Sequence, residues 1–124
     1  MTDWQSYVDD DLLGGGLLTA AVIIDATGGA TLAHSDGYDL KDGEGAAIID
    51  KFEIPLKALV EGVAVNGITY TGVEADDRSI YGKNGDTGVA LARTSKAIVI
   101  GYYNAQRQPE LARLLVDKVA SYLV

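Results

Sequence analysis

The sequence lacks several of the residue types on which common functional sites depend. It contains no cysteine, which excludes a disulfide framework and any zinc site built on cysteine. Its single histidine, His34, leaves carboxylates as the main ligands for any metal, and we predict neither a metal nor a cofactor. No apolar run approaches the ~20 residues that a membrane-spanning helix needs. The first residues have no basic lead and no apolar core, so we expect no signal peptide and a cytoplasmic location.

Basic residues are few and unevenly distributed. The chain has 10 basic and 18 acidic residues, a net charge of −8, which argues against nucleic acid as the main partner. Residues 1–50 hold ten acids and one base, whereas residues 78–124 hold seven bases and three acids. Such a chain can present a basic face to an acidic partner. The alternative is that these charges are scattered over solvated surface.

The pattern of apolar residues predicts one α+β domain over residues 1–124. At 124 residues and 48% hydrophobic, the chain can bury one substantial core. Helical spacing and capping predict four helices, at residues 2–13, 42–51, 55–59 and 109–123. Turn residues and alternating apolar residues predict strands at residues 20–24, 30–34, 63–65, 68–70, 71–75, 79–82, 89–92 and 97–102. We expect an antiparallel sheet with the two terminal helices together on one face.

Three of the predicted helices have a predicted inward face. The last helix has a wide apolar stripe, which consists of Leu111, Leu115, Val119 and Leu123 with Ala112, Val116 and Ala120 beside them. In the first helix, Trp4, Val8 and Leu12 recur every four residues. In the helix at residues 42–51, we expect Ala46 and Ile49 to point inward, with Phe52 close behind.

Motifs for catalysis are absent. The glycine-rich segment at residues 82–88 lacks the Gly-Lys-Ser/Thr ending of a phosphate loop and precedes a strand, so a hairpin loop is favoured. Three consecutive aspartates at residues 9–11 lack the alternating spacing of a calcium loop. His34 has Ser35 and Asp36 beside it, but sequence neighbours cannot orient one another as a catalytic triad. We therefore predict that the protein is not an enzyme.

Aromatic residues of the terminal helices form the first candidate binding site. Trp4 and Tyr7 lie three residues apart, and Tyr122 lies near the end of the last helix. Each of them can simply anchor its helix on the sheet. If the terminal helices meet, however, these side chains form a shallow groove suited to a polyproline II peptide.

Several distinctive motifs are spread along the whole chain. They are WQSYVD at residues 4–9, DRSIYGK at residues 77–83 with Gly85 and Gly88 behind it, and Gln108-Pro109 before a helix that ends in SYL. A shorter motif is AHS at residues 33–35. Together these motifs resemble those of the profilin family. The resemblance implies a central antiparallel sheet with the terminal helices on one face and smaller helices on the other.

The same resemblance implies two binding sites and their partners. The proline-rich peptide site falls on Trp4, Tyr7, Leu32, Tyr122 and Leu123. The site for monomeric actin falls on Arg78, Lys83, Arg93, Gln108, Glu110, Arg113 and Lys118. Actin is acidic, so the basic C-terminal third fits this role. We also expect weak binding of anionic phosphoinositides to the same bases, a location at the cytoskeleton and a monomeric state.

Two positions depart from the family pattern. Leu32 stands where profilins commonly carry a tryptophan that stacks in the peptide groove, so we expect weaker peptide binding than is usual. Glu110 stands where a glycine is common, and it puts a negative charge on the expected actin surface. A different class of function stays open from the residues alone, namely a small α+β sensor or scaffold domain that binds a metabolite or a non-actin protein.

Overall fold

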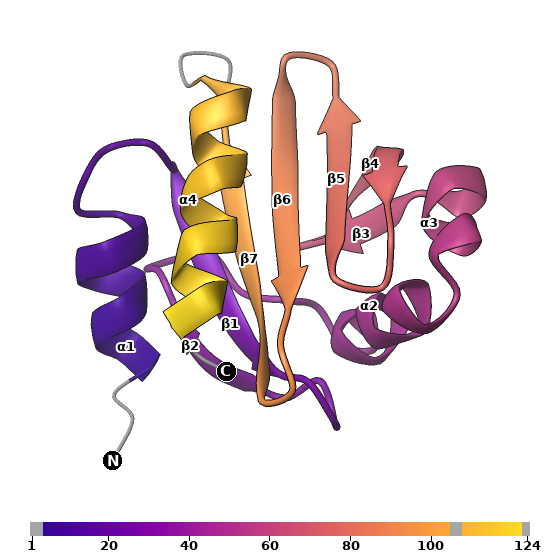
Figure 1. The fold of residues 1–124 in the computed structure, drawn as a ribbon, viewed down its shortest axis with the longest axis horizontal. Helices are drawn as coiled ribbons and strands as arrows, with labels where there is room; N and C mark the ends of the chain where they lie inside the picture. Colours follow the sequence, from indigo (N-terminus) through magenta and orange to yellow (C-terminus); the bar gives the residue numbers. More distant parts are fainter. Residues whose placement is uncertain (1–3, 105–107, 123–124) are drawn as a thin grey trace.

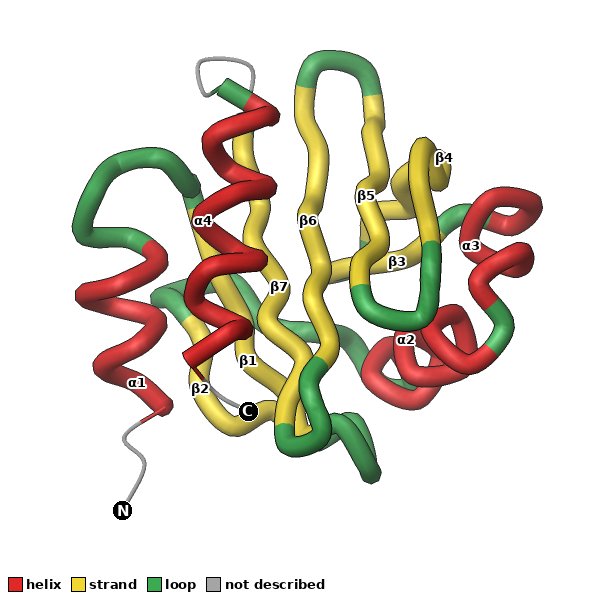
Figure 2. Tube along the Cα trace, in the orientation of Figure 1, coloured by secondary structure: helices red, strands yellow, loops and turns green. Residues whose placement is uncertain are grey.

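The computed structural model describes residues 4–104 and 108–122, which form one curled antiparallel sheet with helices on both faces (Figures 1 and 2). The helical segments are α1 (Trp4–Ser6), η1 (Tyr7–Leu12), α2 (Glu44–Glu53), α3 (Pro55–Glu61) and α4 (Pro109–Tyr122). The strands are β1 (Ala20–Asp25), β2 (Thr31–His34), β3 (Val63–Val65), β4 (Ile68–Ala75), β5 (Ser79–Asn84), β6 (Thr87–Arg93) and β7 (Ala97–Tyr103). Among the described residues, no helix is both long and apolar enough to cross a membrane.

The strands lie in the order β2-β1-β7-β6-β5-β4-β3, and each neighbouring pair is antiparallel. Two irregularities occur near the candidate sites. The pairing of β1 with β2 shifts between Ile23 and Ile24, which leaves Leu32 as an extra residue on β2. The pairing of β4 with β5 shifts between Gly72 and Glu74, which leaves Val73 as an extra residue on β4. Each shift is a β-bulge, a feature that re-aims side chains at the rims of sheets.

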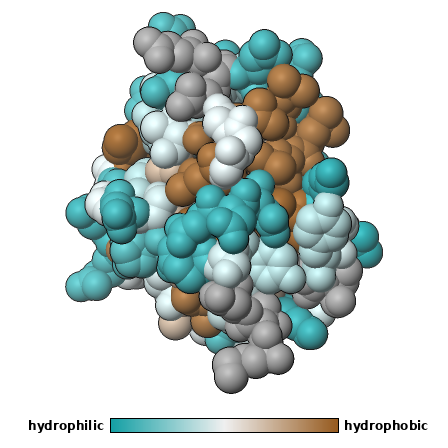
Figure 3. Space-filling model, turned by 90° about the vertical axis from the view of Figure 1, so that its left-hand side faces the viewer, coloured by the Kyte–Doolittle hydropathy of each residue, from teal (hydrophilic) through white to brown (hydrophobic). Residues whose placement is uncertain are grey.

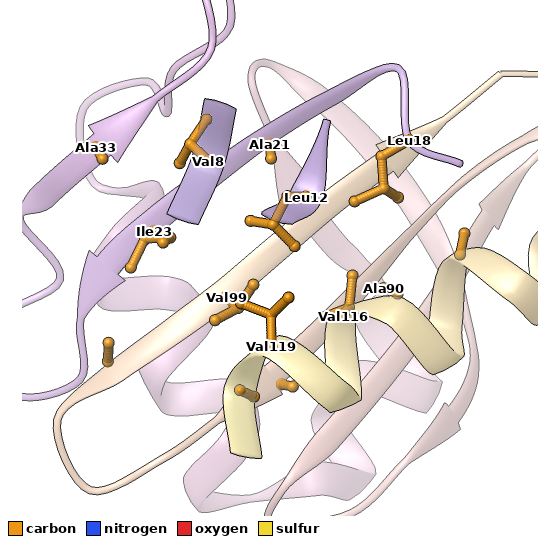
Figure 4. Close-up of a cluster of buried hydrophobic side chains, with 14 of the residues drawn as sticks. Val8, Leu12, Leu18, Ala21, Ile23, Ala33, Ala90, Val99, Val116 and Val119 are labelled. Atoms are coloured by element: carbon orange, nitrogen blue, oxygen red, sulfur yellow. The ribbon is translucent and has the colours of Figure 1, made fainter. Parts of the chain in front are cut away.

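Successive residues of the central strands point into two separate cores, one on each face of the sheet. The terminal helices cover the first face, where Val8 and Leu12 of η1, Val116 of α4 and Val99 of β7 belong to one buried cluster (Figure 4). The shorter helices cover the second face, where Phe52 of α2 belongs to the buried cluster. The predicted arrangement, with terminal helices on one face and small helices on the other, is confirmed.

The first helix differs from the prediction in its winding. Residues Tyr7–Leu12 form a π-helix, and the backbone N–H of Leu13 donates to the carbonyl oxygen of Val8 at 3.0 Å. This wider turn belongs to a class of distortions that is common at functional sites. Val8 and Leu12 are both fully buried, as their four-residue spacing predicts.

The inward face of α2 is not the predicted one. Ile48 and Phe52 are buried, whereas Ala46 is exposed and Ile49 is half-buried. The reason is Glu44, which turns inward at the start of the helix. One carboxylate oxygen accepts hydrogen bonds from the backbone N–H groups of Lys41 (2.8 Å) and Asn66 (2.7 Å), and the other accepts one from Gly67 (2.7 Å). This buried acid joins the start of α2 to the turn between β3 and β4, and it sets the rotation of the helix.

Candidate protein-binding surfaces

The predicted peptide groove lies where the two terminal helices meet. They run in opposite directions, so the start of α1 and the end of α4 lie at the same end of the molecule (Figure 1). The rings of Trp4 and Tyr7 are both half-buried, with centroids 6.5 Å apart and planes tilted by 49°. Tyr122 is 53% exposed. Three of the predicted aromatic contacts are therefore available at one end of the helix pair.

A groove of about 190 Å³ continues between η1 and α4. It is lined by Asp10, Asp11, Leu115, Lys118, Val119 and Tyr122. On the side of the molecule that carries α1, hydrophilic surface crosses the middle and apolar surface lies above it (Figure 3). The acids and Leu115 are contacts that the sequence analysis missed. Their spacing along each helix can be obtained from the sequence. Which side of η1 faces α4, however, depends on tertiary packing.

The remaining predicted peptide residues have different surroundings. Leu32 is 38% exposed at the bulge of β2, a strand that lies beside α1. Leu123 lies outside the described residues. Near Leu32, the side chain of Gln5 donates to the carbonyl oxygen of His34 at 2.9 Å, which fastens the first helix to the end of β2.

The second candidate surface is the part of the first sheet face that α4 leaves uncovered. Helix α4 packs on β6 and β7, so it lies to one side of β5. On β5, Tyr81 packs against the first core, whereas Ile80 is buried in the second. Lys83 follows Tyr81 by two residues and therefore points to the same face as Tyr81. Lys83 is exposed there.

Arg113 joins this surface from α4. Its guanidinium carbon lies 4.5 Å from the centroid of the Tyr81 ring, in cation–π geometry. The Tyr81 hydroxyl donates to Oδ2 of Asp117 at 2.8 Å, and the Ser79 hydroxyl donates to Oδ1 of the same carboxylate at 3.3 Å. Burial, and after it the hydrogen bond to Asp117, raises the pKa of Tyr81 to about 12. Tyr81 therefore stays a neutral hydrogen-bond donor at physiological pH.

Arg78 and Arg93 meet at the other end of β5 and β6. They line two neighbouring hollows of about 460 Å³ and 300 Å³. The side chain of Arg93 is already engaged on the second face of the sheet, where it lies over the Phe52 ring at 5.4 Å and 3.5 Å from the Glu53 carboxylate. Arg78 is exposed. Of this pair, Arg78 is thus the base that is more available to a partner.

The other predicted actin residues divide between the two surfaces. Gln108 and Glu110 are exposed at the start of α4. Lys118 lines the groove with Tyr122, on the flank of α4 opposite Arg113. Five residues of an α-helix make about 1.4 turns, so Arg113 and Lys118 leave the helix axis about 140° apart, which explains the divergence. The structure thus groups Lys83 with Arg113, and Arg78 with Arg93, while Lys118 stands apart.

An exposed apolar cluster beside the second surface was also missed. Leu56, Leu59 and Val60 of α3 are 66%, 43% and 75% exposed, and Val73 at the bulge of β4 is 46% exposed. Helix α3 packs on β4, so these side chains share one edge of the sheet. The sequence did contain a signal. Helix α3 has more apolar residues than one inward stripe can bury, and only Ala58 is buried.

An antiparallel sheet with helices on both faces, an aromatic groove and a separate basic surface defines a small protein-binding module. A family model described as Profilin matches residues 2–124, and the chain belongs to the profilin family. Profilins are actin-monomer-binding regulators of the cytoskeleton and not enzymes, so the predicted class of protein is confirmed.

Individual relatives agree over nearly the whole chain. Profilin-P of Physarum polycephalum is 47% identical over 121 residues, which cover 98% of this chain and 95% of the relative. The crystal structure of Acanthamoeba castellanii profilin II matches with a TM-score of 0.93 and 43% identity, over 98% of this chain and 96% of that one. LokiProfilin2 in complex with rabbit actin matches with a TM-score of 0.80 at 22% identity, over 99% of this chain and 97% of that one, a likeness of fold.

Proposed function

We propose that an actin monomer binds the surface formed by β4, β5 and the adjoining flank of α4. The observation that carries this proposal is the uncovered face of β5. Arg113 lies over the Tyr81 ring there and Lys83 points to the same face as Tyr81, and neither base has an ion pair among the described residues. The exposed apolar side chains of α3 and Val73 adjoin it. Basic groups around an apolar area suit an acidic protein partner, because complementary charge speeds association and buried apolar surface stabilises the complex.

Charge reversal at this surface tests the actin proposal. We expect Arg113→Glu to weaken actin binding about tenfold or more, and Arg78→Glu to weaken it several-fold, since both leave partner carboxylates facing a like charge. Binding should also weaken as salt rises, because exposed charges are screened within ~8 Å at physiological ionic strength. The measurement is a titration of labelled monomeric actin. Lys41→Glu, an exposed charge reversal before α2, is the matched control. Unchanged affinity in both arginine variants at low salt would place the actin site elsewhere.

We also propose that the groove between the terminal helices binds proline-rich peptides. Trp4 and Tyr7 are half-buried and pack against the first core, so each of these rings is anchored on one side and open on the other, and Tyr122 is exposed. A polyproline II peptide loses little entropy when its rings stack on such aromatic faces. The indole N–H and the phenol hydroxyls can donate to its free carbonyl groups. Helix anchoring and peptide binding are compatible roles for half-buried rings.

The leucine at the bulge of β2 offers a gain-of-affinity test. We expect Leu32→Trp to strengthen polyproline binding several-fold, because Leu32 is already 38% exposed and an indole adds one stacking face and one donor. The measurement is a fluorescence titration with a polyproline peptide, and in the parent protein Trp4 is the only tryptophan. Leu56→Trp, at an exposed position on α3, controls for a nonspecific gain. An equal gain from both variants would contradict a role for Leu32.

The remaining predicted properties follow from charge. Binding to anionic phosphoinositides should be weak, because the net charge of −8 opposes it and only the local bases favour it. A monomeric state and a location in the cytoplasm at the cytoskeleton stay predictions. The rival idea of a metabolite-binding domain finds less support, since the hollows that contain predicted site residues are open ones at the surface.

A further inference from the structure

Arg113 has no carboxylate partner, although one lies a single helical turn away. Asp117 follows Arg113 by four residues on α4, the spacing at which opposite charges on a helix commonly pair. The ion pairs among the described residues are Lys51–Glu61, Lys57–Asp50 and Arg93–Glu53, and Arg113 is in none of them. No further interaction of Arg113 replaces the missing pair, apart from its ring contact with Tyr81.

The neighbouring strand accounts for the missing pair. Ser79 and Tyr81 of β5 donate hydrogen bonds to the two different oxygens of Asp117, at 3.3 Å and 2.8 Å. The ring of Tyr81 at the same time supports the guanidinium of Arg113. One tyrosine therefore holds the acid with its hydroxyl group and the base with its ring, and it keeps the two charges apart.

The guanidinium is left with unused donors. Its Nε atom is buried and has no hydrogen-bond partner, whereas the two terminal nitrogens are not among the buried unpartnered atoms. Since Arg113 makes no hydrogen bond within the described part of the chain, the terminal nitrogens face solvent. A buried donor without an acceptor is costly, so it calls for an explanation. The N–H groups of these terminal nitrogens lie in the plane of the guanidinium, and a carboxylate can accept two such hydrogen bonds side by side.

We propose that Arg113 is a preformed receptor for a carboxylate of the actin monomer, and that Tyr81 and Ser79 keep it vacant by engaging Asp117. This inference rests on the proposed actin site and assigns a task to two residues of β5 that the sequence analysis did not select. Tyr81 is a positioning residue, because it acts on the partner through Arg113. Ser79 supports the same hydrogen-bond arrangement.

A carboxylate fits this receptor better than a phosphate on a membrane. Charged groups of both signs share the face of Tyr81 with Arg113. Asp117 follows Arg113 by one helical turn, Glu74 lies directly across from Tyr81 on the paired strand β4, and Lys83 follows Tyr81 by two residues on β5. Glu110 lies nearly one turn earlier on α4. These acids repel any anion, but they repel a single carboxylate less than a multiply charged phosphate or an anionic bilayer.

Substitutions of Tyr81 test the inference. Tyr81→Phe keeps the ring under Arg113 but releases Asp117, which can then pair with Arg113, and we expect about threefold weaker actin binding. Tyr81→Leu also removes the cation–π support, and we expect about tenfold weaker binding. Adding Asp117→Asn to Tyr81→Phe removes the competing charge and should restore most of the affinity. Tyr102→Phe, a half-buried tyrosine in the second core, is the control.

Three measurements separate the outcomes. Actin titrations give the affinities, the NMR signal of the Arg113 Nε–H group reports pairing with Asp117, and co-sedimentation with phosphoinositide vesicles tests phosphate as the ligand. A new Arg113–Asp117 contact in Tyr81→Phe, with affinity restored by Asp117→Asn, supports the receptor. Normal actin binding by Tyr81→Phe and Tyr81→Leu overturns it while leaving the actin site intact. Absent actin binding by the parent protein overturns both proposals. If the Tyr81 variants lose vesicle binding but keep normal actin binding, the ligand of Arg113 is a phosphate and the carboxylate assignment is wrong.

Discussion

Replacing Gly72 by valine is expected to lower the free energy of unfolding by about 3 kcal/mol, because the site has no room for a side chain. A Cβ atom at Gly72 would lie 2.1 Å from the carbonyl oxygen of Ala58 and 3.1 Å from the Cα of Leu59. Both are backbone atoms of α3, so no side-chain rotation relieves the clash and the helix must move away from β4. The gain in strand propensity from a β-branched residue is smaller than this cost.

The same substitution should also impair actin binding. Displacing α3 moves the exposed apolar residues Leu56, Leu59 and Val60 relative to β5, whereas the peptide groove lies on the other face of the sheet. We therefore expect weaker actin binding with unchanged polyproline binding in the folded fraction.

Denaturant unfolding and the two binding titrations measure these effects. Gly72→Ala is the milder variant if the valine protein does not fold. Gly15→Val, at a glycine with no heavy atom within 4 Å of an added Cβ, is the matched control. A stability within about 0.5 kcal/mol of the parent protein would show that α3 does not pack against Gly72 this closely.

The layered fold was predictable because the local signals agree with one another. Asn66-Gly67 forms the turn between β3 and β4, with both residues at positive φ as a tight hairpin requires. The wide apolar stripe of α4 does face the sheet, but its centre is rotated from the prediction: Ala112, Val116, Val119 and Ala120 are buried, whereas Leu111 is exposed. The bulge at Val73 was not predictable, and residues 68–70 and 71–75 turned out to be one continuous strand. An extra residue in a strand shows only when the partner strand is known.

The sequence predicted which residues belong to the candidate sites, but not how these residues lie relative to one another. Periodicity placed Lys118 and Arg113 on one helix, yet only the packing of α4 between η1 and β5 shows that they face different grooves. Arg93 follows the buried Ala92, and strand alternation turns it to the second face. The contact of Tyr81 with Asp117 joins residues 36 positions apart, so no local pattern could have indicated it.

Truncation of Trp4 is expected to have the largest effect on peptide binding. A central aromatic anchor commonly contributes ~2 kcal/mol or more, so Trp4→Ala should weaken polyproline binding about 30-fold. Trp4 is placed for this role, because it packs against the first core on one side, stays half-exposed on the other and neighbours the Tyr7 ring. The peptide then covers the open side of the indole and accepts its N–H.

The design of this experiment must separate lost peptide contacts from lost packing. Calorimetry measures the affinity, since the alanine variant has no tryptophan left to report by fluorescence. Trp4→Phe retains a ring but not the indole donor, and it should bind with intermediate affinity. Actin binding should be unchanged in both variants, because the actin surface lies across α4 from Trp4, and this serves as the control for folding. If Trp4→Ala lowers stability but binds the peptide as the parent protein does, Trp4 only anchors its helix, and the groove must lie elsewhere.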